Sequence, residues 1–185
     1  MKKFFGLLIF GMGIMQFSLA QDSEGKGGFD KSKLFVGGGL GLAFGTYTIV
    51  NVSPLVGYRF SELFAAGVGI NYSYYGYNDG YWNYKQSYVG MSIFGRVYPV
   101  RQFFIQVQPE ENYMWYNASG IGTNQGAPSF QINQFVPSLL IGGGAAIPTG
   151  GNGAITISVM YDVLQNQYSP YYRQAVYGFG YNVGF

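Results

Sequence analysis

From residue 34 to the end of the chain, apolar side chains recur at every second position. The clearest case is 175–185, where alanine, tyrosine, phenylalanine and valine alternate with residues that are mostly glycine or polar. A period of two places the apolar set on one face of a β-strand. The same alternation predicts eight strands, over 34–44, 47–60, 63–76, 87–98, 102–116, 134–147, 154–164 and 171–185.

The connectors between these strands alternate in length. Those around 60–62, 99–101 and 148–153 are short, whereas 77–86, 117–133 and 165–170 are longer, and only the short connector at 45–46 departs from this order. Short turns at one rim and long loops at the other are typical of an outer-membrane barrel, and each predicted strand is long enough for the roughly 9–11 residues that a tilted strand needs to cross a bilayer. The predicted fold class is therefore all-β, an eight-stranded antiparallel up-and-down transmembrane β-barrel.

The polar faces decide which way the apolar faces point. A soluble lipocalin-like barrel would turn its apolar faces inward around a ligand, while a membrane barrel turns them outward to lipid. The polar faces here contain mainly glycine, serine, asparagine and glutamine, which suit a packed lumen better than a water-exposed exterior.

Aromatic residues near the long-loop rim are expected to form an interfacial girdle, with stacking of sugars or lipid headgroups as the alternative. They are Tyr74, Tyr77, Tyr81, Trp82, Tyr84 and Trp115.

The N-terminus has the organisation of a secretory signal peptide. Lys2 and Lys3 precede an apolar stretch over 4–15, and Ser18 to Ala20 form a small-x-small cleavage site. We expect cleavage after Ala20, a flexible lead-in over 21–33, the barrel over 34–185, and a location in the cell outer membrane.

Composition supports export to a membrane and excludes several kinds of chemistry. Charged residues make up 10% of the chain, against an ordinary value of about 25%. Removal of Lys2 and Lys3 would leave eight basic residues against eight acidic ones, which argues against a nucleic-acid partner. The chain has no cysteine and no histidine, so it lacks the histidine base that a serine nucleophile needs near neutral pH. We therefore expect no enzyme activity, no metal site and no cofactor.

The final strand, Tyr-Gly-Phe-Gly-Tyr-Asn-Val-Gly-Phe over 177–185, completes a familiar pattern. With the signal peptide and eight alternating segments, the chain resembles the small outer-membrane β-barrel family, the OmpA/OmpX-like barrels of Gram-negative bacteria. The resemblance implies outer-membrane lipid and the barrel-assembly machinery as partners, with Tyr181, Val183 and Phe185 as the assembly signal. In one respect we expect a departure from the larger OmpA-type proteins, namely a chain that ends at the barrel without a peptidoglycan-binding domain.

Strand parity places a small cluster of charges in the lumen. These residues are Arg59, Arg96, Glu110 and Asp162, with Gln106, Gln108 and Asn112 beside them. Because an unpaired charge in a narrow barrel is costly, we expect guanidinium–carboxylate pairs that plug the lumen, with an ion gate as the alternative. The predicted function is a non-enzymatic structural or surface-recognition protein whose extracellular-loop ligand is unknown. The alternatives are a narrow channel for small solutes and a soluble lipocalin-like binding barrel.

Overall fold

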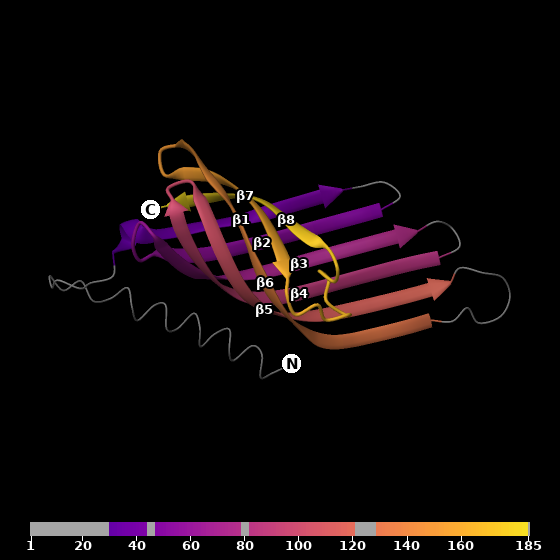
Figure 1. The fold of residues 1–185 in the computed structure, drawn as a ribbon. Helices are drawn as coiled ribbons and strands as arrows, with labels where there is room; N and C mark the ends of the chain where they lie inside the picture. The colour runs from indigo at the N-terminus through magenta and orange to yellow at the C-terminus, as the bar shows by residue number, and fades with distance from the viewer. Residues whose placement is uncertain (1–29, 44–46, 79–81, 121–128, 185) are drawn as a thin grey trace, which may run out of the picture. The chain divides into compact units, whose positions relative to one another are not determined.

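The chain folds into a closed antiparallel barrel of eight strands in the order β1 to β8, in which β8 pairs back onto β1. The computed structural model describes residues 30–43, 47–78, 82–120 and 129–184 (Figure 1). The predicted all-β up-and-down architecture is confirmed. The predicted signal peptide and all but residues 30–33 of the lead-in lie outside the described residues.

The strands follow the predicted order, with several shifted ends. They are β1 (Leu34–Ala43), β2 (Tyr47–Arg59), β3 (Phe64–Asn78), β4 (Trp82–Val100), β5 (Phe103–Gly120), β6 (Ser129–Gly150), β7 (Gly153–Asp162) and β8 (Ala175–Gly184), preceded by the 3-10 turn η1 (Lys31–Lys33). Residues 82–86, 117–120 and 129–133 were expected in loops but extend β4, β5 and β6. Their polar and aromatic side chains hide the apolar alternation, while the backbone pairing continues through them.

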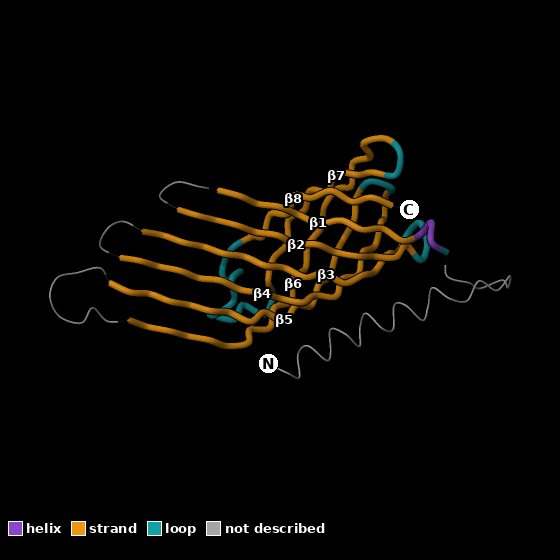
Figure 2. The backbone as a smooth tube through the Cα atoms, turned by 180° about the vertical axis from the view of Figure 1, so that it is seen from behind, coloured by secondary structure: helices purple, strands orange, loops and turns teal. Residues whose placement is uncertain are grey.

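The two rims of the barrel differ in height. Turns at 60–63, 101–102 and 151–152 close one rim, where Phe35 of β1 lies opposite Gly184 of β8. At the other rim, the hairpins β1–β2, β3–β4 and β5–β6 run past the connector between β7 and β8, which folds back towards the barrel (Figure 2). One side of this rim is therefore a projecting wall of β-sheet.

The start of the last strand differs from the prediction. Residues 171–174 were expected to begin it, but they belong to the β7–β8 connector, 163–174, and β8 starts at Ala175. Gln165 and Arg173 adopt positive φ angles of 48° and 56°. This left-handed backbone is incompatible with an extended strand, so the connector turns back into the barrel.

Large apolar side chains cover the outside of the barrel. Leu40, Met91, Ile93, Ile105 and Phe179 are each between 55% and 65% exposed. The soluble lipocalin-like alternative needs these faces to point inward, so the observed orientation contradicts it. Within the described ranges, no helix is both long and apolar enough to cross a membrane.

Candidate functional site

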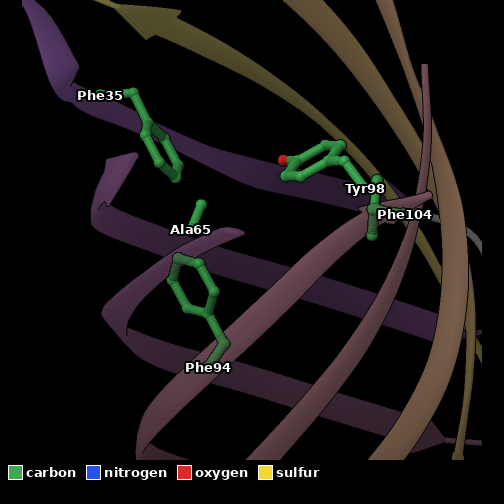
Figure 3. Packing of buried hydrophobic residues seen from close by; sticks show 5 residues of the cluster. All are labelled: Phe35, Ala65, Phe94, Tyr98 and Phe104. Atoms are coloured by element: carbon green, nitrogen blue, oxygen red, sulfur yellow. The ribbon is translucent and has the colours of Figure 1, made fainter. Parts of the chain in front are cut away.

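An apolar floor closes the lumen near the short-turn rim. Phe35, Ala65, Phe94, Tyr98 and Phe104 pack together there, and each is at most 9% exposed (Figure 3). The rings of Phe35 and Phe94 lie 6.4 Å apart between centroids, and those of Tyr98 and Phe104 lie 5.8 Å apart. These side chains come from β1, β3, β4 and β5, so the floor ties distant parts of the wall together.

Arg96 lies on this floor in an environment that is mostly aromatic. Its guanidinium carbon is 4.8 Å from the Phe94 ring centroid and 4.7 Å from that of Phe104. Two such cation–π contacts offset part of the cost of removing the charge from water, because each ring presents its electron-rich face. The residue is only 5% exposed, and its Nη1 atom has no hydrogen-bond partner.

A chain of glutamines connects Arg96 to Glu110. Arg96 Nε donates to Gln106 Oε1 at 2.6 Å, Gln106 Nε2 donates to Gln108 Oε1 at 2.6 Å, and Gln108 Nε2 donates to Glu110 Oε2 at 3.0 Å. Gln106, Gln108 and Glu110 occupy alternate positions of β5, so their side chains share its inner face. In the described part of the chain, this relay links Arg96 to Glu110 in place of the direct guanidinium–carboxylate pairs that were expected among the four lumen charges.

Glu110 is the centre of the polar network. Its Oε1 atom accepts hydrogen bonds from Asn71 at 3.0 Å, Asn112 at 2.8 Å and the Tyr171 hydroxyl at 2.8 Å. Burial, and then the nearby Glu110 charge, raise the pKa of Tyr171 well above 10. The hydroxyl therefore stays protonated at neutral pH and serves as a donor to the carboxylate.

The connector 163–174 forms a roof over this network. Tyr171 packs with Leu140 and Met160, and Val176 lies against the same cluster. Asp162, at 0% exposure, anchors the connector, because its carboxylate accepts from the Leu164 amide at 3.1 Å and the Ser169 hydroxyl at 2.7 Å. The role of Asp162 is therefore to hold the roof, and it stands apart from Arg96.

Arg59 lies outside the polar network. It is exposed at the end of β2, with its guanidinium 5.1 Å from the Tyr98 ring centroid. The four predicted lumen charges therefore fall in three places: Arg59 at the short-turn rim, Arg96 linked to Glu110 in the middle, and Asp162 under the roof. Parity placed all four on inner faces, but height along each strand separated them.

A polar cavity of about 180 Å³ lies between floor and roof. Its lining includes Arg96, Gln108 and Glu110 on one side and Gly39 and Gly178 on the other. Part of the wall is therefore made of glycine, which leaves the space open.

A second hollow, of about 570 Å³, lies above the roof against the projecting wall. We call it the tyrosine cup; Ile49, Ser73, Tyr75, Tyr77, Tyr84, Gln86, Tyr88, Pro170 and Gln174 line it. Tyr84 meets the rings of Tyr75 and Tyr116 edge to face, at interplanar angles of 86° and 89° and centroid distances of 5.9 and 5.1 Å. The cup is thus aromatic and amide-rich, and none of the described residues that line it is charged.

The cup changes the interpretation of the predicted girdle. Tyr77 and Tyr84 line the cup and face inward, contrary to the girdle interpretation. Trp115 is 39% exposed and packs edge to face on Tyr113, and Tyr74 is partly exposed on the opposite face of β3 from Tyr75, as a girdle residue should be. Trp82 begins β4, and Tyr81 lies outside the described residues.

The other predicted sites are partly visible. Tyr181 and Val183 are outward-facing on β8, 46% and 39% exposed, whereas Phe185 lies outside the described residues. The predicted lumen charges and girdle residues did not include Asn71, Tyr171 or Tyr75. The alternation along β3 could have identified Asn71 and Tyr75, but Tyr171 is positioned by the irregular connector, which has no periodic pattern.

Among the described residues, no group of three or more His, Cys, Asp or Glu side chains could hold a metal ion.

Comparison with known proteins leaves the family open. No protein-family model matches the chain, and no curated protein matches it. Among solved structures, the chain is similar to Ail, the attachment invasion locus protein of Yersinia pestis, with 11% identity and a TM-score of 0.49. The match covers 82% of this chain and 94% of Ail. The chemistry of the lumen and the cup therefore has to be derived from this chain's own residues.

Proposed function

We propose that this chain is a non-enzymatic outer-membrane β-barrel that binds a ligand at the cell surface and does not conduct solutes. The observation that carries the proposal is the combination of an apolar outer surface with a lumen closed at two levels. Lipid offers no hydrogen-bond partners, so a closed barrel is one of the few structures that can cross it.

The closed lumen favours recognition over transport. A solute would have to displace both the floor around Phe94 and the roof around Tyr171. An eight-stranded barrel leaves an interior only wide enough for side chains, in agreement with this filling. The narrow-channel alternative would need both obstacles to move together.

The tyrosine cup is the proposed recognition site, and a neutral carbohydrate is the proposed ligand class. Tyrosine rings offer flat apolar faces and hydroxyls, and the amides of Gln86 and Gln174 add donors and acceptors. No described residue of the lining has a charge that would favour an ionic ligand. The cup opens at the rim with the longer connectors, which in a barrel of this kind faces the cell exterior.

Location is tested by fractionation of cells that produce the full chain. The protein should be recovered with the outer membrane and should migrate differently on gels before and after boiling, because a closed barrel resists detergent until heated. Recovery as a soluble periplasmic protein without detergent would overturn the proposal.

Ligand class is tested with the refolded barrel on an array of neutral and acidic oligosaccharides. We expect binding to neutral members, weakened about fivefold or more by Tyr84→Ala, because an aromatic contact is worth about 1 kcal/mol. Tyr74→Ala is the matched control, since this tyrosine lies on the other face of the sheet. Equal losses in both variants, or binding to acidic members alone, would contradict a neutral-sugar cup.

A further inference from the structure

The barrel is closed only in part along the seam between its first and last strands. β1 and β8 share five residue pairs, from Phe35 opposite Gly184 to Gly39 opposite Gly180. β1 shares ten pairs with β2, and β8 shares nine with β7. Within the described residues, β1 continues to Ala43 and β8 reaches back to Ala175 without pairing to each other.

Glycine positions mark where the two strands separate. A Cβ atom built on Gly39 would lie 2.8 Å from the Phe179 carbonyl oxygen, and one on Gly180 would lie 2.5 Å from that of Gly38. A Cβ on Gly41 meets only Asn51 of β2, at 3.5 Å, and one on Gly178 meets only Ser158 of β7. The strands are therefore in contact at Gly39 and apart by the level of Gly41.

The separated stretch, Leu40–Leu42 on β1 and Tyr177–Phe179 on β8, adjoins the polar cavity. Gly39, Tyr177, Gly178 and Phe179 line the cavity together with Arg96. On the outside, Leu40, Leu42, Tyr177 and Phe179 are 54–79% exposed. The opening therefore joins an apolar outer surface to a polar interior.

The wall of the cavity includes a buried hydrogen-bond donor, Nη1 of Arg96, that has no partner. Arg96 is 5% exposed, its Nε donates to Gln106, and its guanidinium also interacts with the Tyr98 side chain, but its Nη1 has no partner. A buried donor left without a partner costs about 1–3 kcal/mol, more when it is charged. An anionic oxygen in the cavity would satisfy it, since a guanidinium and a carboxylate match in charge and planar geometry.

We propose that the seam admits a long-chain carboxylate from the surrounding membrane, with its carboxylate bound at Arg96 and its alkyl chain leaving between β1 and β8. The polar cavity accommodates the head, and the apolar residues beside the opening accompany the chain into lipid. The proposal rests on the membrane location proposed above, but not on the tyrosine cup.

The test uses the full chain refolded in detergent and the fluorescent long-chain carboxylate cis-parinaric acid as probe, with protein-free micelles as blank. Palmitate should displace the probe, whereas hexadecanol, which lacks the carboxylate, and acetate, which lacks the chain, should not at the same concentrations. Displacement by hexadecanol as well as by palmitate would overturn the role of the guanidinium. Displacement by acetate would show a site for free small anions, and would overturn entry from lipid.

Two pairs of variants locate the site. Arg96→Gln should weaken palmitate binding about tenfold or more, because it removes a charge-assisted hydrogen bond, while Arg101→Gln in the exposed β4–β5 turn should not. Gly41→Phe should obstruct the seam and weaken binding, whereas Ile93→Phe, on the outer face of β4 and away from the seam, should not.

Heat-dependent gel mobility reports whether each variant has folded. If Arg96→Gln does not fold, the Gly41→Phe variant tests the proposal instead, since a Cβ at this position would meet only Asn51 Cβ, at 3.5 Å. Unchanged palmitate affinity in a folded Arg96→Gln or Gly41→Phe barrel would overturn the proposal. Failure of the chain to reach the outer membrane in cells would count against the membrane location alone.

Discussion

Hydrogen bonds to buried carboxylates help to hold the connector 163–174 over the lumen. Tyr171 is the residue of the connector that reaches Glu110, at 2.8 Å, and it also lies 3.2 Å from Asn71 Nδ2. A hydrogen bond to a charged group is worth about 1.5–3 kcal/mol. The connector is therefore held at two carboxylates, at Glu110 through the Tyr171 hydroxyl and at Asp162 through Ser169.

Tyr171→Phe should loosen the roof while leaving the barrel intact, because it removes the hydroxyl and keeps the ring. We expect faster tryptic cleavage after the exposed Arg173, followed by mass spectrometry, with Tyr172→Phe as the control. Equal cleavage rates in both variants would show that packing alone holds the connector.

The same hydroxyl should make stability depend on alkaline pH. Burial raises the pKa of Tyr171 above its value in the unfolded chain, so its contribution is complete below about pH 10 and is lost as pH rises through the folded-state pKa. The free energy of unfolding of the wild type should fall more steeply above about pH 10 than that of Tyr171→Phe. Parallel curves from urea titrations would contradict this assignment.

At the scale of the element, glycines allow neighbouring strands to approach closely. A Cβ atom on Gly144 of β6 would overlap the Ile157 carbonyl oxygen of β7 and lie 2.7 Å from Phe104 Cζ in the floor. Both neighbours are packed, so neither can move without disturbing the wall. The glycine run of β6 is therefore a requirement of packing against β7 and the floor.

Gly144→Ala should destabilise the refolded barrel by about 1–3 kcal/mol through overpacking. Gly41→Ala is the matched control, because its Cβ would meet only Asn51, at 3.5 Å. Urea unfolding followed by tryptophan fluorescence measures both. A similar loss in the two variants would mean that backbone flexibility, and not close approach, is what glycine provides.

At the scale of the whole molecule, the floor and the roof act as two independent barriers. Conduction requires both to open, and they are built from different residues, with Phe35 and Phe94 in one and Leu140 and Tyr171 in the other. A solute that moves along the axis of the described barrel therefore meets both clusters.

The refolded protein should show no steady conductance in planar bilayers, because a side-chain-filled lumen of this width excludes hydrated ions. Detergent without protein serves as the baseline. A persistent ohmic current, proportional to the amount of protein added, would favour the narrow-channel alternative over surface recognition.

The sequence by itself determined the number, order and facing of the strands. Alternation along a strand is a local property with a period of two. The outer face of Ile93 and the inner face of Arg96 could therefore be assigned without knowing which strands lie beside theirs. Asn71, Glu110 and Asn112 could likewise be assigned to inner faces from parity alone.

Only the tertiary structure decided which inner residues meet and at what height. Register between strands depends on the stagger of the closed barrel, which placed Arg96 beside Gln106 and separated both from Asp162. The connector 163–174 has no period, and its position follows from long-range hydrogen bonds to Glu110 and Asp162. The tyrosine cup and the open seam arise in the same way, because each depends on where neighbouring strands end relative to one another.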